Sequence, residues 1–254
     1  MRSRYATLKS QDMNVAKRTA ACDELLADVS PLVDDFVSAV RAWRTSSYDL
    51  RGEPFYPSGS RGVSTQTSGT IMVIDKLKKH ALISVTAESP SSFAFVDREI
   101  SPARTPDGTY SHGRKATTTG RGGIDYVART LGATPTPILG EIKVEGDKDA
   151  FYAFIQLLTY VSELCSEAQA ARARKHLFQD MVNCSASWDL HILLADFDNV
   201  RSQRHPLIER THQLAKKFKA TLASRGERSP VGRIRCLRMT TATFNGSLDE
   251  TWAV

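Results

Sequence analysis

The sequence predicts an α/β fold in which a mixed central sheet is flanked by helices, preceded by an N-terminal helical segment. Residues 11–45 have apolar spacing typical of helices. Apolar runs of strand length are then scattered from residue 81 to 239, with helical stretches between the last of them. The apolar content of 41% and charged content of 24% are typical of a globular chain. We expect one domain over residues 1–254, with a helical extension of about 1–45 and a core of about 70–240.

The N-terminal segment contains a clear signal for a break between two helices. Ser30 is a favourable N-cap, and Pro31 suits the first helical turn, so one helix is expected to end near Val29 and the next to begin at Pro31. The second helix carries apolar residues at helical spacing up to Trp43. Residues 46–69 are rich in Ser, Gly and Pro and are expected to form a loop.

The remaining elements alternate between strands and helices. Strands are expected at 81–85, 93–96, 122–129, 138–144, 189–197 and 232–239, with helices at 149–171 and 206–223. Residues 101–120 form a second expected loop, which carries several basic residues against one acid, Asp107. This order favours a sheet covered by helices.

The charge balance points to an acidic partner. The chain has 34 Lys and Arg against 28 Asp and Glu, for a formal net charge of +6, and 22 of the 34 basic residues are arginine. Arginine binds phosphate through two parallel hydrogen bonds, which makes an acidic polymer a candidate partner.

Other features concern compartment and membrane. We find no run of 18 apolar residues and no apolar block behind the N-terminal charges, so we expect neither a membrane-spanning helix nor a secretory signal. The cysteines form no Cys-x2-Cys pair, which argues against a zinc knuckle or an iron–sulfur cluster. We interpret Cys22, Cys165, Cys184 and Cys236 as buried free thiols of a cytoplasmic protein.

Candidate chemistry lies on the hairpin between the strands 122–129 and 138–144. Glu141 and Lys143 share one face, because side chains alternate along a strand. If the hairpin closes symmetrically about residue 133, Asp125 lies opposite Glu141, with Cβ atoms about 5 Å apart. Two carboxylates that close repel each other unless a cation joins them, and Mg²⁺ is the usual one beside phosphates. Lys143 would add a positive charge that holds an attacking water or offsets charge on phosphate.

The following helix adds a second pair of polar residues. Gln156 and Tyr160 are four residues apart and therefore stack on one face, away from the main apolar stripe. They either steady a ligand near the hairpin or simply form the wet side of the helix. Likewise, Glu141 and Lys143 alone are typical of a solvated strand face, and Asp125 after two glycines is typical of a turn. It is the combination of these features that favours a site.

The combination resembles the PD-(D/E)XK nuclease superfamily, which has the restriction-endonuclease-like fold. Its pattern is an Asp on one core strand, (D/E)-x-K on the next, and a following helix. The branch of RecB-like and lambda-exonuclease-like nucleases adds Gln-x3-Tyr on that helix. The matching residues are Asp125, Glu141-Ile142-Lys143, Gln156 and Tyr160.

The resemblance implies a role for each matched residue. Asp125, Glu141 and the backbone carbonyl of Ile142 would bind Mg²⁺, for which Mn²⁺ would substitute. Lys143 would position the nucleophilic water, while the Gln-x3-Tyr pair would orient the active site and the DNA. The proline of the name is replaced by Ile124. The family's upstream acid is not assigned, with Asp34, Asp35 and Glu88 as unranked candidates.

These observations predict a metal-dependent nuclease that hydrolyses DNA phosphodiester bonds with a Mg²⁺-activated water. Two alternatives remain: a nucleic-acid-binding module of the same fold without turnover, and an α/β protein unrelated to nucleic acid. A homo-oligomer and a larger nucleic-acid-processing complex are both left open as assemblies. The loop before the hairpin is predicted either to track the phosphate backbone or to be merely solvated. Its basic residues are Arg104, Arg114, Lys115 and Arg121, and the next set is Arg201, Arg204, Arg233 and Arg235.

Overall fold

The structure is a computed structural model that describes residues 1–9, 14–45, 68–88, 91–100, 123–144, 149–179, 187–196, 206–226 and 228–254. The helices are α1 (Arg2–Lys9), α2 (Val15–Ala27), α3 (Ser30–Arg44), α4 (Ser68–Lys78), α5 (Ala150–Leu164), α6 (Glu167–His176) and α7 (Pro206–Ser224). The strands are β1 (Ile83–Thr86), β2 (Ser91–Ile100), β3 (Ile124–Thr130), β4 (Pro137–Val144), β5 (Trp188–Asp196), β6 (Val231–Thr240) and β7 (Ser247–Ala253).

The described strands are joined in chain order into a closed barrel. Strands β1 to β4 form an antiparallel meander, β4, β5 and β6 run parallel, and β7 returns antiparallel to β6. A parallel pairing of β7 with β1 closes the barrel, with Ser84 opposite Ser247 and Thr86 opposite Asp249. The predicted open, restriction-endonuclease-like sheet flanked by helices is therefore wrong. The closing strand β7 was not predicted, because its sequence SLDETWA interrupts the apolar alternation with acidic residues.

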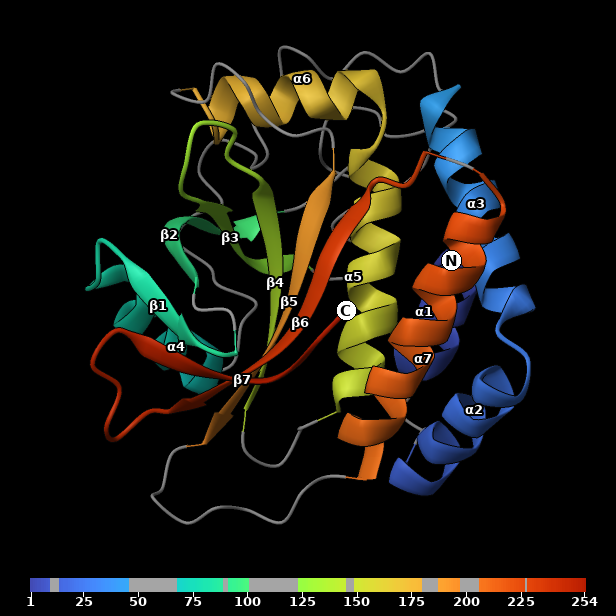
Figure 1. The fold of residues 1–254 in the computed structure, drawn as a ribbon, viewed down its shortest axis with the longest axis horizontal. Coiled ribbons are helices and arrows are strands. Elements are labelled where there is room, and N and C mark those ends of the chain that lie inside the picture. Colours follow the sequence, from blue (N-terminus) through green and yellow to red (C-terminus); the bar gives the residue numbers. More distant parts are fainter. Residues whose placement is uncertain are drawn as a thin grey trace.

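The helices lie mainly on one side of the barrel wall. Helix α5 packs on β4 and β5, and α1, α3 and α7 pack in turn on α5 (Figure 1). Helix α4 contacts β2 and β4, and α6 follows α5 across one end of the barrel (Figure 1). Helix α5 is thus enclosed between the barrel and an outer helical layer. Among the described helices, none combines the length and apolarity needed to cross a membrane.

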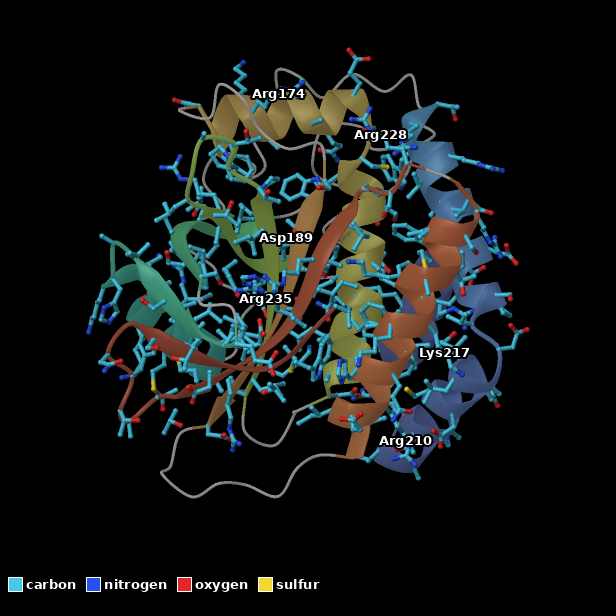
Figure 2. All side chains as sticks on the ribbon, viewed as in Figure 1. Arg174, Asp189, Arg210, Lys217, Arg228 and Arg235 are labelled. Atoms are coloured by element: carbon cyan, nitrogen blue, oxygen red, sulfur yellow. The ribbon has the colours of Figure 1, made fainter. Side chains whose placement is uncertain are left out.

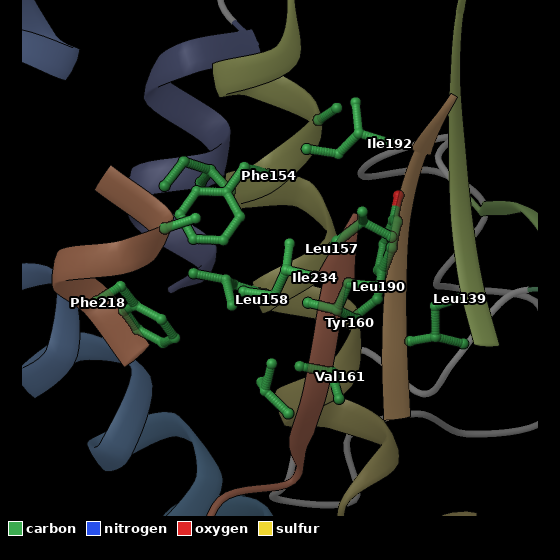
Figure 3. Close-up of a cluster of buried hydrophobic side chains, with 14 of the residues drawn as sticks. Leu139, Phe154, Leu157, Leu158, Tyr160, Val161, Leu190, Ile192, Phe218 and Ile234 are labelled. Carbon is green, nitrogen blue, oxygen red and sulfur yellow. The ribbon is translucent and has the colours of Figure 1, made fainter. Parts of the chain in front are cut away.

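The barrel wall separates two hydrophobic cores. Leu139 and Ile192 point outward into the core shared with the helices, whereas Ile138 and Leu193 point inward. Figure 3 shows part of the outer core, where Phe154, Leu157 and Leu158 of α5 lie between the strands and Phe218 of α7. Because both faces of β4 and β5 are buried, these strands need apolar residues on both sides, which explains their nearly continuous apolar sequences.

Several element boundaries follow from local capping chemistry. The predicted break near Val29 is confirmed, since α2 ends at Ala27 and α3 begins at Ser30. The helix predicted over 149–171 is two helices instead, because Ser166 caps a new helix by accepting a hydrogen bond from the backbone of Gln169 (3.2 Å). Helix α1 was not predicted because its sequence is mostly polar, and α4 was not predicted because its apolar run at 71–74 is too short to indicate a helix by itself.

Candidate metal and nuclease site

The β3–β4 hairpin brings Asp125 to Glu141. Tyr126 pairs with Gly140 and Val127 with Leu139, which confirms that the hairpin closes about residue 133. Continuing this register places Asp125 opposite Glu141. The Asp125 carboxylate accepts a hydrogen bond from the backbone N–H of Ile142 (2.8 Å), so it lies against the Glu-x-Lys triplet.

Glu141 and Lys143 form a buried ion pair on the outer face of β4. The Lys143 Nζ atom donates to Glu141 Oε1 at 3.1 Å, and the two residues are only 5% and 3% exposed. The interpretation of these two residues as a solvated strand face is therefore wrong. A buried charged pair needs further polar neighbours to be stable, because ions lose their hydration on burial.

Helix α5 supplies those neighbours. Gln156 Oε1 accepts from Lys143 Nζ (3.4 Å), and Gln156 Nε2 donates to the hydroxyl of Tyr160 (3.1 Å). The hydrogen bonds thus form a chain from Glu141 through Lys143 and Gln156 to Tyr160. The interpretation of Gln156 and Tyr160 as the wet side of the helix is wrong, since both are buried. Figure 3 shows Tyr160 between α5 and the strands, beside Leu190.

The electrostatic environment of Glu141 is unfavourable to its charge. Burial raises the pKa of Glu141 well above its ordinary value, and the neighbouring charge of Asp125 raises it further. Lys143 and Gln156 act in the opposite direction by stabilising the carboxylate. Burial also raises the pKa of Tyr160, which keeps its phenol neutral as a hydrogen-bonding group. A cation between the two carboxylates would relieve the repulsion.

The donor set fits a hard divalent cation. Glu141 Oε2 is buried and makes no hydrogen bond with any described residue, and Asp125 adds a second carboxylate next to it. With the carbonyl of Ile142, the site would offer oxygen ligands, which Mg²⁺ and Mn²⁺ prefer. Within the described ranges, no group of three or more His, Cys, Asp or Glu side chains gathers to hold a metal ion. Among the described residues, the site therefore provides two carboxylates, Asp125 and Glu141, as side-chain ligands for a metal ion.

The candidates for an upstream acid are engaged elsewhere. Asp35 pairs with Arg4 of α1 at 2.7 Å, and Asp34 pairs with Arg225 near the end of α7. Glu88 lies exposed after β1. The partners of Asp34 and Asp35 are therefore arginines outside the cluster of Glu141 and Lys143.

The basic residues predicted to bind DNA are only partly placed. Arg104, Arg114, Lys115 and Arg121 lie outside the described residues, as do Arg201 and Arg204. Of the next set, Arg235 is buried in the sheet, where it pairs with Glu250 at 3.2 Å (Figure 2). Its guanidinium is therefore not exposed for contact with nucleic acid. The backbone of Arg233 donates to Asp189 (2.7 Å).

Two tyrosines next to the cluster were not predicted as site residues. The ring of Tyr152 lies under Lys143 Nζ at 4.6 Å from its centroid, and Tyr5 of α1 stacks on Tyr152 at 5.7 Å. Tyr152 could have been found from the sequence, because it precedes Gln156 by one helical turn just as Tyr160 follows it. Tyr5 could not, since its contact with α5 depends on how α1 docks.

No protein-family model, curated protein or solved structure matches this chain. The function of the cluster must therefore be inferred from its own residues.

Proposed function

We propose that this chain is a Mg²⁺-dependent nuclease that hydrolyses DNA phosphodiester bonds at the cluster of Asp125, Glu141 and Lys143. The observation that carries the proposal is the buried pair of Glu141 and Lys143, in which Glu141 Oε2 has no hydrogen-bond partner among the described residues. A buried carboxylate oxygen without a hydrogen bond destabilises the folded chain unless it binds a cation or a proton. The motif resemblance to PD-(D/E)XK nucleases gives the same residues this chemistry.

The residues of the cluster divide between metal binding and positioning. Asp125, Glu141 and the carbonyl of Ile142 would hold the cation. When bound, Mg²⁺ would supply Lewis-acid chemistry, favouring hydroxide at neutral pH and neutralising phosphate charge. Lys143 would orient the attacking water and offset charge that develops on the phosphate. The amide of Gln156, itself held by Tyr160, fixes the ammonium group of Lys143.

Asp125 is the most exposed side chain of the cluster. Gly123 and Asp125 are partly exposed, whereas Glu141, Lys143 and Gln156 are buried behind them. A phosphate would therefore meet Asp125 first. The positive charge of the chain would favour this approach, because DNA binding gains from neutralising phosphates.

A non-catalytic nucleic-acid-binding module is the second candidate. It is favoured by the near-complete burial of Lys143, whose ammonium already has partners in Glu141 and Gln156. In that case the cluster would serve only to join α5 to the hairpin. A metal dependence of cleavage separates the two candidates.

The cellular setting is proposed from the cysteines. Cys22, Cys165 and Cys236 are free thiols, and two of them are fully buried. This chemistry supports a reducing compartment, and we propose the cytoplasm.

The test is cleavage of plasmid and linear DNA by the purified chain in Mg²⁺, Mn²⁺ or EDTA. We expect both forms of DNA to be substrates, with cutting in either metal and none in EDTA. Asp125→Asn should abolish cutting, because it removes one carboxylate from the metal set. Asp249→Asn is the matched control, since Asp249 is exposed on β7. Cutting in EDTA, or full activity of Asp125→Asn, would refute the proposal.

A further inference from the structure

A cavity of about 430 Å³ lies at the end of the barrel where β4, β5 and β6 begin. Its size is in the range of small-molecule sites. It is separate from the cluster: Pro137, in its wall, precedes Glu141 by four residues on β4, roughly 13 Å along the strand. The lining residues come from α3, α5, α6, β4 and the segments that lead into β5 and β6.

The inner wall of the cavity is apolar. Trp188 and Phe178 lie against each other with ring centroids 5.9 Å apart, and Leu164 closes the end of α5 beside them. All three are at least nine-tenths buried, which fixes their positions. Ala170 and Ala173 of α6 leave room opposite, because their side chains are small. A flat apolar group would find contact on this wall.

Among the described residues that line the cavity, three arginines lie on its rim and none is acidic. Arg174 of α6 and Arg228, just before β6, are both exposed (Figure 2). Arg44 donates to the backbone carbonyl of Arg228 (3.0 Å), which holds the two residues together. Burial raises the pKa of the partly buried Cys165 thiol, which also lines the cavity, and Arg44 acts in the opposite direction.

We propose that this cavity binds a mononucleotide, with the phosphate on Arg174, Arg228 and Arg44 and the base against Trp188. Guanidinium groups recognise phosphate through paired hydrogen bonds, and none of the described residues that line the cavity carries a carboxylate that would compete for them. A phosphate alone would contact only the arginines and would leave the apolar wall of the cavity without a partner. The site does not depend on the proposed nuclease activity.

The experiment is isothermal titration of the full chain with AMP, GMP, CMP or UMP in EDTA, so that a metal at the Asp125 cluster does not contribute. Adenosine and inorganic phosphate are titrated separately. We expect at least one mononucleotide to bind about tenfold or more tightly than either part alone, because both halves of the cavity are then used. Failure of all four nucleotides to bind would overturn the proposal, as would binding of phosphate alone with equal affinity.

A matched pair of variants locates the binding. Arg174→Gln with Arg228→Gln should weaken nucleotide binding by about tenfold or more, the loss expected for charge-assisted hydrogen bonds. Lys175→Gln with Lys216→Gln removes the same charge from exposed positions outside the cavity and should leave the affinity unchanged. Equal loss in both double variants would mean that only net charge matters, and the proposed site would be wrong.

Discussion

Glu141 carries a buried carboxylate of which only one oxygen is paired within the described part of the chain. One oxygen is paired with Lys143, the other has no hydrogen bond among the described residues, and Asp125 adds a like charge nearby. A folded chain can keep such a carboxylate buried when the carboxylate binds a functional ligand or when it is protonated. The contrast with Asp34 and Asp35, which are partly exposed and paired with arginines, sets Glu141 apart as the functional candidate.

His191 is a second buried ionisable residue, inside the barrel. Its Nδ1 atom lies 3.4 Å from the hydroxyl of Tyr126, and the edge of the Phe93 ring packs on it. Burial lowers the pKa of His191 to about 3, and the positive charges of Arg235 and Arg233 act in the same direction. The imidazole is therefore neutral in the folded chain at all ordinary pH values.

This neutral histidine makes stability depend on pH. Between its unfolded pKa near 6.5 and its folded pKa, only the unfolded chain binds the proton, so stability is complete above 6.5 and falls as the pH falls. From pH 7 to pH 5 we expect His191 to reduce the free energy of unfolding by about 2 kcal/mol. Urea unfolding of the wild type and His191→Gln at both pH values measures this contribution. If the wild type and the variant show the same pH dependence, the account of His191 is wrong.

The residues of the candidate site could largely be named from the sequence, whereas their surroundings could not. Spacing alone identified Asp125, Glu141 and Lys143, because strand alternation and hairpin symmetry are local rules. Burial of Gln156 was missed, since a helix enclosed on all sides has no wet face and the enclosing helices are distant in sequence. Tyr5 was missed for the same reason.

At the scale of elements, the β3–β4 hairpin depends on the close approach of the Tyr126 ring to Gly140 on the neighbouring strand. A Cβ atom on Gly140 would lie only 2.0 Å from the ring of Tyr126, its partner across the strands. The ring has little room to move, because Phe95 stacks on it and His191 contacts its hydroxyl. Gly140 therefore admits the tyrosine into the barrel while its neighbour Glu141 faces outward.

Gly140→Ala should lower the free energy of unfolding by about 2–3 kcal/mol, the upper part of the range for overpacking a core. The control is the same substitution in a Tyr126→Leu background, where the clash with the ring is removed and the cost should shrink. Denaturant unfolding of the four proteins gives the coupling between the two positions. An equal cost in both backgrounds would show that the ring does not require glycine.

Elements with strong local signals were predicted, and those formed by tertiary contacts were not. The break between α2 and α3 follows from Ser30 and Pro31, and strands β4 and β5 follow from their apolar runs. By contrast, β7 has the acidic residues Asp249 and Glu250 in the middle of a short strand, and α4 is short with a mixed sequence. Their formation depends on partners elsewhere in the chain.

At the scale of the whole molecule, closure of the sheet was the largest difference from prediction. Whether a sheet closes depends on the pairing of its outer strands, here β1 with β7, which are about 160 residues apart in sequence. No local pattern encodes such a pairing. The outer face of the barrel still carries the cluster, because the hairpin and α5 that build it are neighbours along the chain.

The proposed nuclease activity requires the buried pair of Glu141 and Lys143 to be catalytic rather than merely structural. Removing one partner alone would leave an uncompensated buried charge, so loss of folding could be mistaken for loss of chemistry. The double variant Glu141→Gln with Lys143→Met avoids this, because it removes both charges and keeps similar volumes. Arg235→Met with Glu250→Gln is the matched control, since it removes a buried ion pair between two other strands.

The most direct measurement is the rate of Mg²⁺-dependent DNA cleavage by these two double variants and the wild type, after circular dichroism has shown that all three are folded. We expect the Glu141 and Lys143 variant to cleave at least about 100-fold more slowly, the scale of losing a positioned catalytic charge. The Arg235 and Glu250 variant should stay close to the wild-type rate. A folded Glu141 and Lys143 variant that cleaves DNA as fast as the wild type would contradict the account.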